Sequence, residues 1–345
     1  MMDLVTKLAQ DGILTEPEFT ELLTTEDSGL RSYLFQVAQH LAHQHFHHKV
    51  YIRGLIELTN HCQRDCFYCG LRCSNKNIKR YRLSKETVLD CCKIGYTTGF
   101  RTFVLQGGED LYYNDEVLCD LVASIKTKYP NCAITLSVGE RSYRSYKALF
   151  EAGADRYLLR HETANSLHYS RLHPPSYSLL KRQECLNNLK EIGYQVGTGF
   201  MVGSPYQLIE YFTEDLVFIR KLEPAMVGIG PFIPHKDTPF RNQPPGTIEE
   251  TLRLIAILRI MLPAANIPST TALGTLHPDG RVHGILAGAN VLMPNLTPVA
   301  EQALYSLYNK KATVDGELMS NLQTLNSQLG AYGYQLTVDR GDYQG

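Results

Sequence analysis

The chain has 345 residues, of which 43% are hydrophobic and 20% charged, enough for one large α/β domain or two ordinary ones. Its 34 basic and 35 acidic residues nearly cancel, so composition favours neither a nucleic-acid nor an anionic-membrane partner. The sequence has no apolar run of membrane-spanning length and no signal-peptide pattern at its start, so we expect a cytoplasmic protein that does not contact membranes.

The first 50 residues predict a helical cap. Residues 15–18 have the form of a capping box, and Leu30, Leu34, Val37 and Leu41 recur at helical spacing. We interpret residues 1–50 as an N-terminal helical cap on the rest of the chain.

From residue 51 onward, short β-rich runs alternate with longer amphipathic segments, which is the pattern of repeated βα units around a parallel sheet. Eight runs fit a closed (βα)8 barrel of the TIM type. The predicted strands are 51–58, 102–106, 133–137, 156–160, 196–201, 226–229, 267–270 and 290–293. The predicted return helices include 84–98, 114–128, 179–192, 208–222 and 248–261.

We expect the barrel to occupy residues 51–310, with a short helical C-terminal extension over residues 311–345 packed on it. In such barrels the chemistry lies at the carboxyl ends of the strands. Here those ends carry polar groups that would face one mouth, and we interpret them as one site. They are residues 59–62, 107–110, 160–163 and 270–271.

The strongest signal is the segment Cys62-Gln-Arg-Asp-Cys66-Phe-Tyr-Cys69, which follows the first predicted strand. The nine cysteines are odd in number and clustered, so they indicate a metal or a cluster rather than a disulfide framework. Thiolates suit both iron-sulfur clusters and zinc. Structural zinc takes four ligands, and a site completed by Cys73 is the alternative to a 4Fe-4S cluster held by three thiolates.

Several further segments extend the signal beyond this motif. With them the chain resembles the radical SAM (S-adenosylmethionine) superfamily and, within it, the FeFe-hydrogenase maturase family HydE. The CxxxCxxC spacing indicates only the superfamily, whereas RHETAN, GPFIPH and IPSTTA are more particular to the maturases. The segments are ELTNHC (57–62), CGLRCSNKNIKRYRLS (69–84), VLQGGED (104–110), LLRHETAN (158–165), VGIGPFIPHKDTP (227–239), NIPSTTALGT (266–275) and GANVLMPNLTP (288–298).

The resemblance implies one 4Fe-4S cluster whose open iron is chelated by SAM, and reductive cleavage of SAM to methionine and a 5'-deoxyadenosyl radical. No cysteine follows Cys185, so C-terminal ligands for an auxiliary cluster are missing. The residues expected to contact SAM are Tyr68, Gly107, Gly108, Glu109, Glu162, Arg182 and Met201. A structural salt bridge is the alternative role for Arg182, a plain turn for the two glycines, and simple core packing for Tyr68 and Met201.

A second set of residues is expected, by resemblance, to face the substrate. A guanidinium with flanking hydroxyl groups suits a carboxylate, which it can bind through two hydrogen bonds. The set consists of Thr135, Arg160, Thr270, Thr271, Tyr305 and Tyr308. The alternative role for Arg160 is a buried ion pair with Glu162 or Asp155.

The function implied by the resemblance is a step in assembling the di-iron site of FeFe hydrogenase. Its substrate would be a small organometallic species, a cysteine-ligated iron carbonyl cyanide made by a partner maturase. An external electron donor and transient contacts with other maturases are expected. The first alternative is methylornithine synthase (PylB) or another radical SAM mutase, and biotin synthase is a more distant relative. A non-catalytic iron-sulfur scaffold or electron carrier is the second alternative, and it would not need Glu162 or Arg182.

Overall fold

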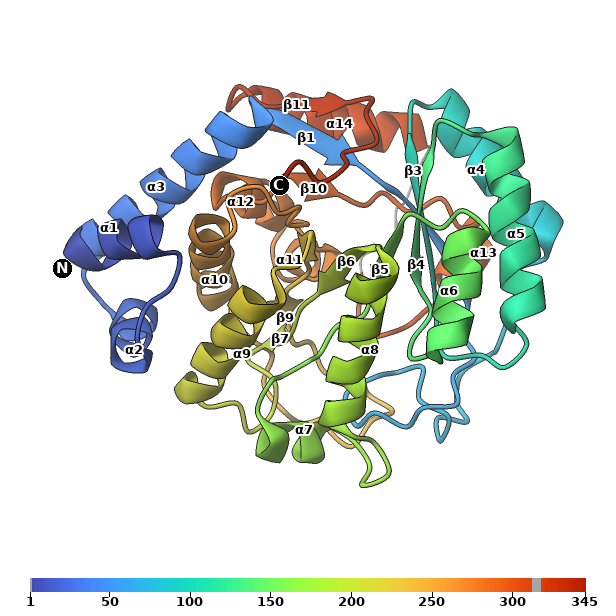
Figure 1. Ribbon diagram of the computed structural model, residues 1–345, viewed down its shortest axis with the longest axis horizontal. Coiled ribbons are helices and arrows are strands. Elements are labelled where there is room, and N and C mark those ends of the chain that lie inside the picture. Colours follow the sequence, from blue (N-terminus) through green and yellow to red (C-terminus); the bar gives the residue numbers. More distant parts are fainter. Residues whose placement is uncertain (1, 312–317) are drawn as a thin grey trace.

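The computed structural model describes residues 2–311 and 318–345. Three helices precede the barrel and lie at the left of Figure 1, against the barrel helices α9 and α10. The predicted capping box starts the second of them, where the Thr15 N–H donates to the Glu18 carboxylate at 2.9 Å. Their apolar side chains share one core with the barrel wall. The three helices are α1 (Met2–Asp11), α2 (Glu16–Thr24) and α3 (Ser28–Phe46).

Parallel strands and single bridges close into a ring of eight segments, which confirms the predicted TIM-type α/β barrel. Six strands form a continuous sheet in the order β2-β3-β4-β5-β6-β8. Bridges from Met226 to Asn266, from Pro268 to Val291 and from Asn295 to Leu55 complete the ring. The six strands are β2 (Gly54–Thr59), β3 (Thr102–Gly107), β4 (Ala133–Ser137), β5 (Arg156–Leu158), β6 (Gln195–Thr198) and β8 (Met226–Val227).

Three predicted strands differ from the structure, namely 51–58, 196–201 and 267–270. The run 196–201 ends as a strand at Thr198, and its last residue, Met201, belongs to a separate pair of strands. The run 51–58 is divided at Arg53 into β1 (Lys49–Ile52) and β2, and β1 pairs instead with β10 (Val291–Leu292) and β11 (Gln335–Thr337). The run 267–270 is no regular strand, because Pro268 has no N–H to donate to a ladder and makes a single bridge. At the mouth, β7 (Met201–Val202) and β9 (Gly230–Pro231) form a separate pair.

Helices surround the sheet, and the five predicted return helices are confirmed within two residues at each end as α4, α5, α8, α9 and α10 (Figure 1). Polar caps such as Ser84 and Asn114 accept backbone N–H groups where α4 and α5 begin. The helices after the cap are α4 (Lys85–Thr97), α5 (Asp115–Lys128), α6 (Tyr143–Glu151), α7 (Ser166–Leu172), α8 (Leu179–Ile192), α9 (Ile209–Leu222), α10 (Ile248–Met261), α11 (Thr271–Leu276), α12 (Gly280–Leu286), α13 (Val299–Gln302) and α14 (Leu318–Gly330).

The end of the described chain crosses the floor of the barrel, opposite the mouth. After β11, the Gly341 carbonyl accepts a hydrogen bond from the Arg53 guanidinium at 3.2 Å, and Asp342 accepts one from the fully buried Arg156 at 2.6 Å. The predicted extension over residues 311–345 therefore contains a strand and a floor segment besides α14, while its residues 312–317 lie outside the described part. Domain boundaries at residues 50 and 310 stay a prediction.

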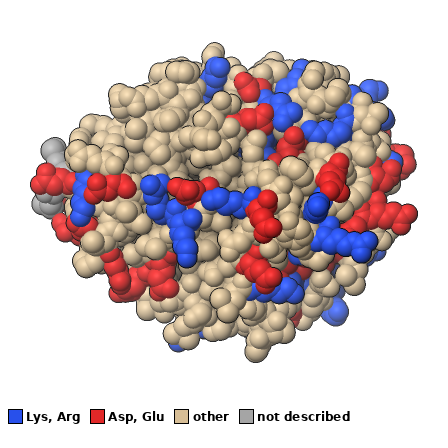
Figure 2. Space-filling view, in the orientation of Figure 1, with Lys and Arg blue, Asp and Glu red and all other residues tan. Residues whose placement is uncertain are grey.

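Figure 2 shows acidic and basic groups intermixed across the middle and the right of the face that it draws, without a large area of one sign. Within residues 2–311 and 318–345, no helix has the length and apolar character needed to cross a membrane.

Candidate active site

The loop that carries the three cysteines follows β2 and lies at the lower right of Figure 1. Its base is fixed by Asn60, which is fully buried. The Asn60 amide donates to the carbonyls of Lys79 at 2.8 Å and Leu304 at 2.9 Å, and accepts the Tyr81 N–H at 2.7 Å. One side chain thus ties the start of the loop to its end and to the segment that carries Tyr305.

The thiols of Cys62, Cys66 and Cys69 are free and lie within electrostatic range of one another. Burial, followed by repulsion from Cys62, raises the pKa of Cys69 to about 12. Within the described residues, no three His, Cys, Asp or Glu side chains converge on a single metal position. Three thiols on one loop can hold a 4Fe-4S cluster, in which each thiolate binds its own iron.

The end of β3 packs directly on this loop. A Cβ atom on Gly108 would lie 2.1 Å from the His61 carbonyl oxygen and 2.7 Å from the Cys62 Cβ, so only glycine allows the contact. The Gln63 N–H donates to the Glu109 carbonyl at 2.9 Å. Close packing against the loop therefore explains Gly108, and the neighbouring Gly107 is the last residue of β3.

A network of two arginines and two glutamates supports the loop from outside. Glu109 pairs with Arg64 at 2.5 Å, Arg64 pairs with Glu140 at 2.8 Å, and Glu140 pairs with Arg182 at 2.5 Å. Burial favours the protonated form of Glu140, but Arg182 and Arg64 outweigh it and lower the pKa of this carboxyl group. The Glu109 side chain therefore helps to support the cysteine loop through its ion pair with Arg64.

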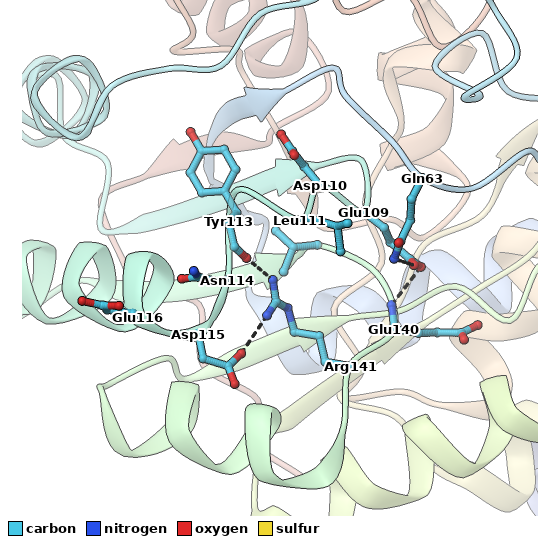
Figure 3. Close-up of a pocket in the computed structure, with 11 residues that line it drawn as sticks. Gln63, Glu109, Asp110, Leu111, Tyr113, Asn114, Asp115, Glu116, Glu140 and Arg141 are labelled. Atoms are coloured by element: carbon cyan, nitrogen blue, oxygen red, sulfur yellow. Dashed lines mark hydrogen bonds and ion pairs between the residues drawn. The ribbon is translucent and has the colours of Figure 1, made fainter.

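The sequence interpretation missed Arg64 and Glu140. Both carried a usable signal, because Arg64 lies inside the cysteine motif and Glu140 follows the end of the third predicted strand. Figure 3 shows Glu109 and Glu140 beside Gln63 at one wall of a cavity of about 470 Å³. Of the residues expected to hold SAM or substrate, only Glu109 lines this cavity, so it is a hollow beside the loop and not the barrel chamber.

Arg182 retains donor capacity after these contacts. Its Nε donates to Glu140 and its Nη1 donates to the Arg160 carbonyl at 2.7 Å, while Nη2 has no hydrogen-bond partner in the described part of the chain. The side chain is 10% exposed. Arg182 is therefore both a structural ion pair and a positioned donor, so the two roles considered for it are compatible.

Tyr68 and Met201 lie in one apolar cluster at the mouth, with Leu172, Phe232 and Phe240. The Tyr68 hydroxyl contacts His173 Nε2 at 3.2 Å. An aromatic ring beside a thioether and two phenylalanines is a surface on which a flat heterocycle can pack.

Tyr169 is a third residue that the sequence interpretation missed. Its ring stacks on His173 at 4.0 Å between centroids. Its hydroxyl is buried without a hydrogen-bond partner in the described residues. This hydroxyl lies close enough to Arg182 to raise the pKa of the Arg182 guanidinium. A buried unpaired hydroxyl beside a free guanidinium donor marks a place where a polar ligand group fits.

Several of the buried polar atoms that lack a hydrogen-bond partner in the described chain belong to predicted site residues. They are Thr135 Oγ1, Arg160 Nε and Nη2, Glu162 Oε2 and Thr270 Oγ1. Each such atom typically costs about 1–3 kcal/mol when it is left unpaired. A bound ligand that satisfies them would recover this free energy.

Arg160 and Glu162 are brought together at the end of β5. Their charged groups lie 3.2 Å apart, in a geometry that leaves both without a good hydrogen bond. Glu162 has a positive φ of 67°, a strained conformation for a residue with a side chain. The two side chains are thus held close together, and each has buried polar atoms without a hydrogen bond to which a ligand could bind.

The segment that carries Tyr305 and Tyr308 packs against the cysteine loop. The Gly70 N–H donates to the Leu307 carbonyl at 2.8 Å. The Tyr305 hydroxyl accepts from Gln106 at 3.2 Å, and the Lys311 ammonium lies 4.7 Å from the Tyr305 ring centroid.

Lys311 also pairs with the fully buried Glu57 of β2. Burial raises the pKa of Tyr308 to about 12, and Arg160 and Arg281 oppose this shift, so Tyr308 lies near both guanidinium groups.

Thr271 is the first residue of α11, and its carbonyl accepts the Thr275 hydroxyl at 3.0 Å.

Family models and known proteins identify the family of the chain. A model of the Radical SAM superfamily matches residues 56–219, and a model of the Biotin and Thiamin Synthesis associated domain matches residues 224–309. The chain is 45% identical over 306 residues to the FeFe hydrogenase maturase subunit HydE of Thermotoga maritima, covering 87% of each protein. It is 29% identical to 3-methylornithine synthase of Methanosarcina acetivorans, covering 83% of this chain and 81% of that protein.

Solved structures support the same fold. Methylornithine synthase (PylB) superposes with a TM-score of 0.81 at 25% identity, over 97% of both chains. The hydrogenase maturase HydG superposes with a TM-score of 0.79 at 20% identity, over 97% of this chain and 76% of that one. The barrel fold is therefore shared by proteins with different names, so the fold alone does not separate them. The 45% sequence identity to HydE does separate HydE from the other relatives named here.

Proposed function

Since this chain belongs to the radical SAM superfamily and, within it, to the FeFe-hydrogenase maturase family HydE, we propose that its barrel mouth binds SAM beside one 4Fe-4S cluster and a carboxylate-bearing substrate deeper in the chamber. It is a radical SAM enzyme of hydrogenase maturation. The observation that carries the proposal is the set of unpaired buried polar atoms of Arg160, Glu162, Thr135 and Thr270, which lie on the strand ends behind a loop with three free thiols.

The cluster would be held by Cys62, Cys66 and Cys69, with Cys73 outside the ligand set. When bound, the reduced cluster supplies the electron that cleaves SAM to methionine and a 5'-deoxyadenosyl radical. The residues of the chain contribute position and exclusion of water. Asn60 holds the loop, and Gly108 lets β3 close against it.

SAM would be oriented by charge at one end and by packing at the other. Arg182, fixed by Glu140, offers its free Nη2 to the carboxylate of SAM. Glu162 offers the polar N–H or O–H groups of SAM a carboxylate oxygen that has no hydrogen bond within the described residues, and Tyr68 with Met201 offers an apolar surface for the adenine. The backbone at Gly107 and Gly108 would border the methionyl amino group.

The proposed substrate is a cysteine-ligated iron carbonyl cyanide species, and its amino-acid carboxylate would bind at Arg160. Hydroxyl groups of Thr135, Thr270 and Thr271 would complete the hydrogen bonds, since a guanidinium alone leaves carboxylate lone pairs free. Tyr305 and Tyr308 would close the chamber. We also propose an external electron donor, transient contacts with other maturases and a cytoplasmic location, where a reducing environment keeps nine free cysteines reduced.

The test is an anaerobic maturation assay in which a mixture of hydrogenase apoprotein and the other maturases lacks its HydE component. Reconstituted protein should restore hydrogenase activity, and in separate reactions with a reductant it should release methionine and 5'-deoxyadenosine from SAM. Cys69→Ser should do neither. SAM cleavage without any restored hydrogenase activity would favour a mutase such as methylornithine synthase, and absence of both would favour a scaffold or electron carrier.

A further inference from the structure

A second cavity lies outside the barrel, between α14 and the turn that joins α11 to α12. Its volume is about 370 Å³, and its walls combine apolar side chains with polar ones; the apolar ones include Pro278, Val282, Leu322 and Leu325, and the uncharged polar ones are Asn321, Thr324 and Gln328. Among the described residues that line it, Arg281 is the single cation and no carboxylate is present. The cavity thus combines a hydrophobic wall with one positive charge.

Arg281 is unusual because its guanidinium has no hydrogen bond or ion pair within residues 2–311 and 318–345, although burial lowers its pKa. Two other arginines, both fully buried, have such partners. Arg156 binds Asp342 at 2.6 Å, and Arg259 donates to four oxygen acceptors. A partly desolvated guanidinium with five free N–H donors is unfavourable unless an acceptor occupies the adjoining space.

The neighbours of Arg281 keep the guanidinium at this wall. A Cβ atom on Gly274 would lie 3.0 Å from Arg281 Nε and 3.2 Å from its Cγ, so the glycine makes room for the arginine side chain. The Tyr308 hydroxyl bonds to Thr275 and lies near both Arg281 and Arg160. Tyr308 thus lies near both guanidinium groups, and none of the residues predicted to hold SAM or substrate lines the cavity.

We propose that this cavity binds a small organic carboxylate, with the carboxylate on Arg281 and an apolar body against the leucine, valine and proline walls. A bidentate pair with a guanidinium is the strongest contact available to a carboxylate. Within the described lining, no acidic residue competes for Arg281. The inference is independent of how SAM and the maturation substrate are bound.

The test uses cluster-reconstituted protein and titration calorimetry with sodium hexanoate. The background is Arg160→Gln, so that the barrel chamber does not contribute a second carboxylate site. Adding Arg281→Gln should weaken hexanoate binding about tenfold or more, the effect of losing one charge-assisted contact. Adding Arg241→Gln, which changes an exposed arginine outside the cavity lining, should leave the affinity unchanged.

Gly274→Ala gives a second variant, because the new methyl group would crowd the guanidinium at 3.0 Å; it should weaken hexanoate binding while the circular dichroism spectrum is unchanged. Inorganic phosphate is the second probe and should bind more weakly than hexanoate, since it has no apolar body. Equal hexanoate affinity with and without Arg281→Gln would overturn the site. Phosphate binding as tight as that of hexanoate would overturn the assignment to an organic carboxylate.

Discussion

Replacing Arg182 by alanine tests the proposed orientation of SAM most directly. The side chain is anchored by Glu140 at 2.5 Å and by the Arg160 carbonyl at 2.7 Å, with Nη2 free. Loss of a charge-assisted contact to the SAM carboxylate typically costs about 1.5–3 kcal/mol, or roughly one to two decades in dissociation constant. Glu140 keeps its ion pair with Arg64 at 2.8 Å, so we expect the variant to fold and to retain its cluster.

The assay is SAM binding by equilibrium dialysis on anaerobic protein, with iron and sulfide analysis of the same samples. Arg141→Ala is the matched control, because Arg141 pairs with Asp115 at 2.8 Å across the cavity of Figure 3 and should not affect SAM. Glu140→Gln, which loosens Arg182 without removing its charge, should give a smaller loss than Arg182→Ala. Unchanged SAM affinity in a cluster-loaded Arg182→Ala protein would refute the proposed contact and leave Arg182 a purely structural residue.

Three further predictions follow from the site and the core. Serine at any one of the three motif cysteines should abolish the cluster in iron and sulfide analysis, whereas Cys73→Ser should keep it; the reverse pattern would reassign the ligands. Arg160→Gln should spare the cluster and SAM binding but abolish hydrogenase maturation, and wild-type maturation by the folded variant would eliminate the carboxylate site. Burial lowers the pKa of His168 to about 4, so the neutral form is favoured in the fold. Its contribution to unfolding free energy is complete above pH 6.5 and falls by about 1.4 kcal/mol per unit towards pH 4. Denaturant unfolding of wild type and His168→Gln at pH 7 and pH 5 should therefore show a smaller acid loss for the variant.

The barrel could be predicted because most of its helices and strands are specified by residues that lie close together in the sequence. The run that becomes α10 is hydrophobic nearly all round and is almost fully buried between the cap helices and the sheet. Asn114 and Ser84 begin their helices as polar caps. The cysteine loop was predictable for the same reason, since its spacing is contained in eight residues after one strand.

The parts that were not predictable depend on partners far apart in the chain. Arg53, at which the first predicted strand divides, bonds to the Gly341 carbonyl, 288 positions away. The support of Arg182 by Glu140 joins residues 42 positions apart, and no local periodicity indicates such a pair. The fate of Pro268 was visible in principle, because proline cannot donate to a sheet ladder.

The floor segment also bears on the order of events during synthesis. Ribosomes release a chain from its N-terminus, so every strand of the barrel is available before the residues that bind Arg53 and Arg156. Until Gly341 and Asp342 emerge, two guanidinium groups in the barrel interior lack acceptors that the finished fold gives them. The barrel therefore reaches its final packing only after Gly341 and Asp342 have been translated. A ribosome that stalls just before these residues should carry a nascent barrel that proteases cut more readily.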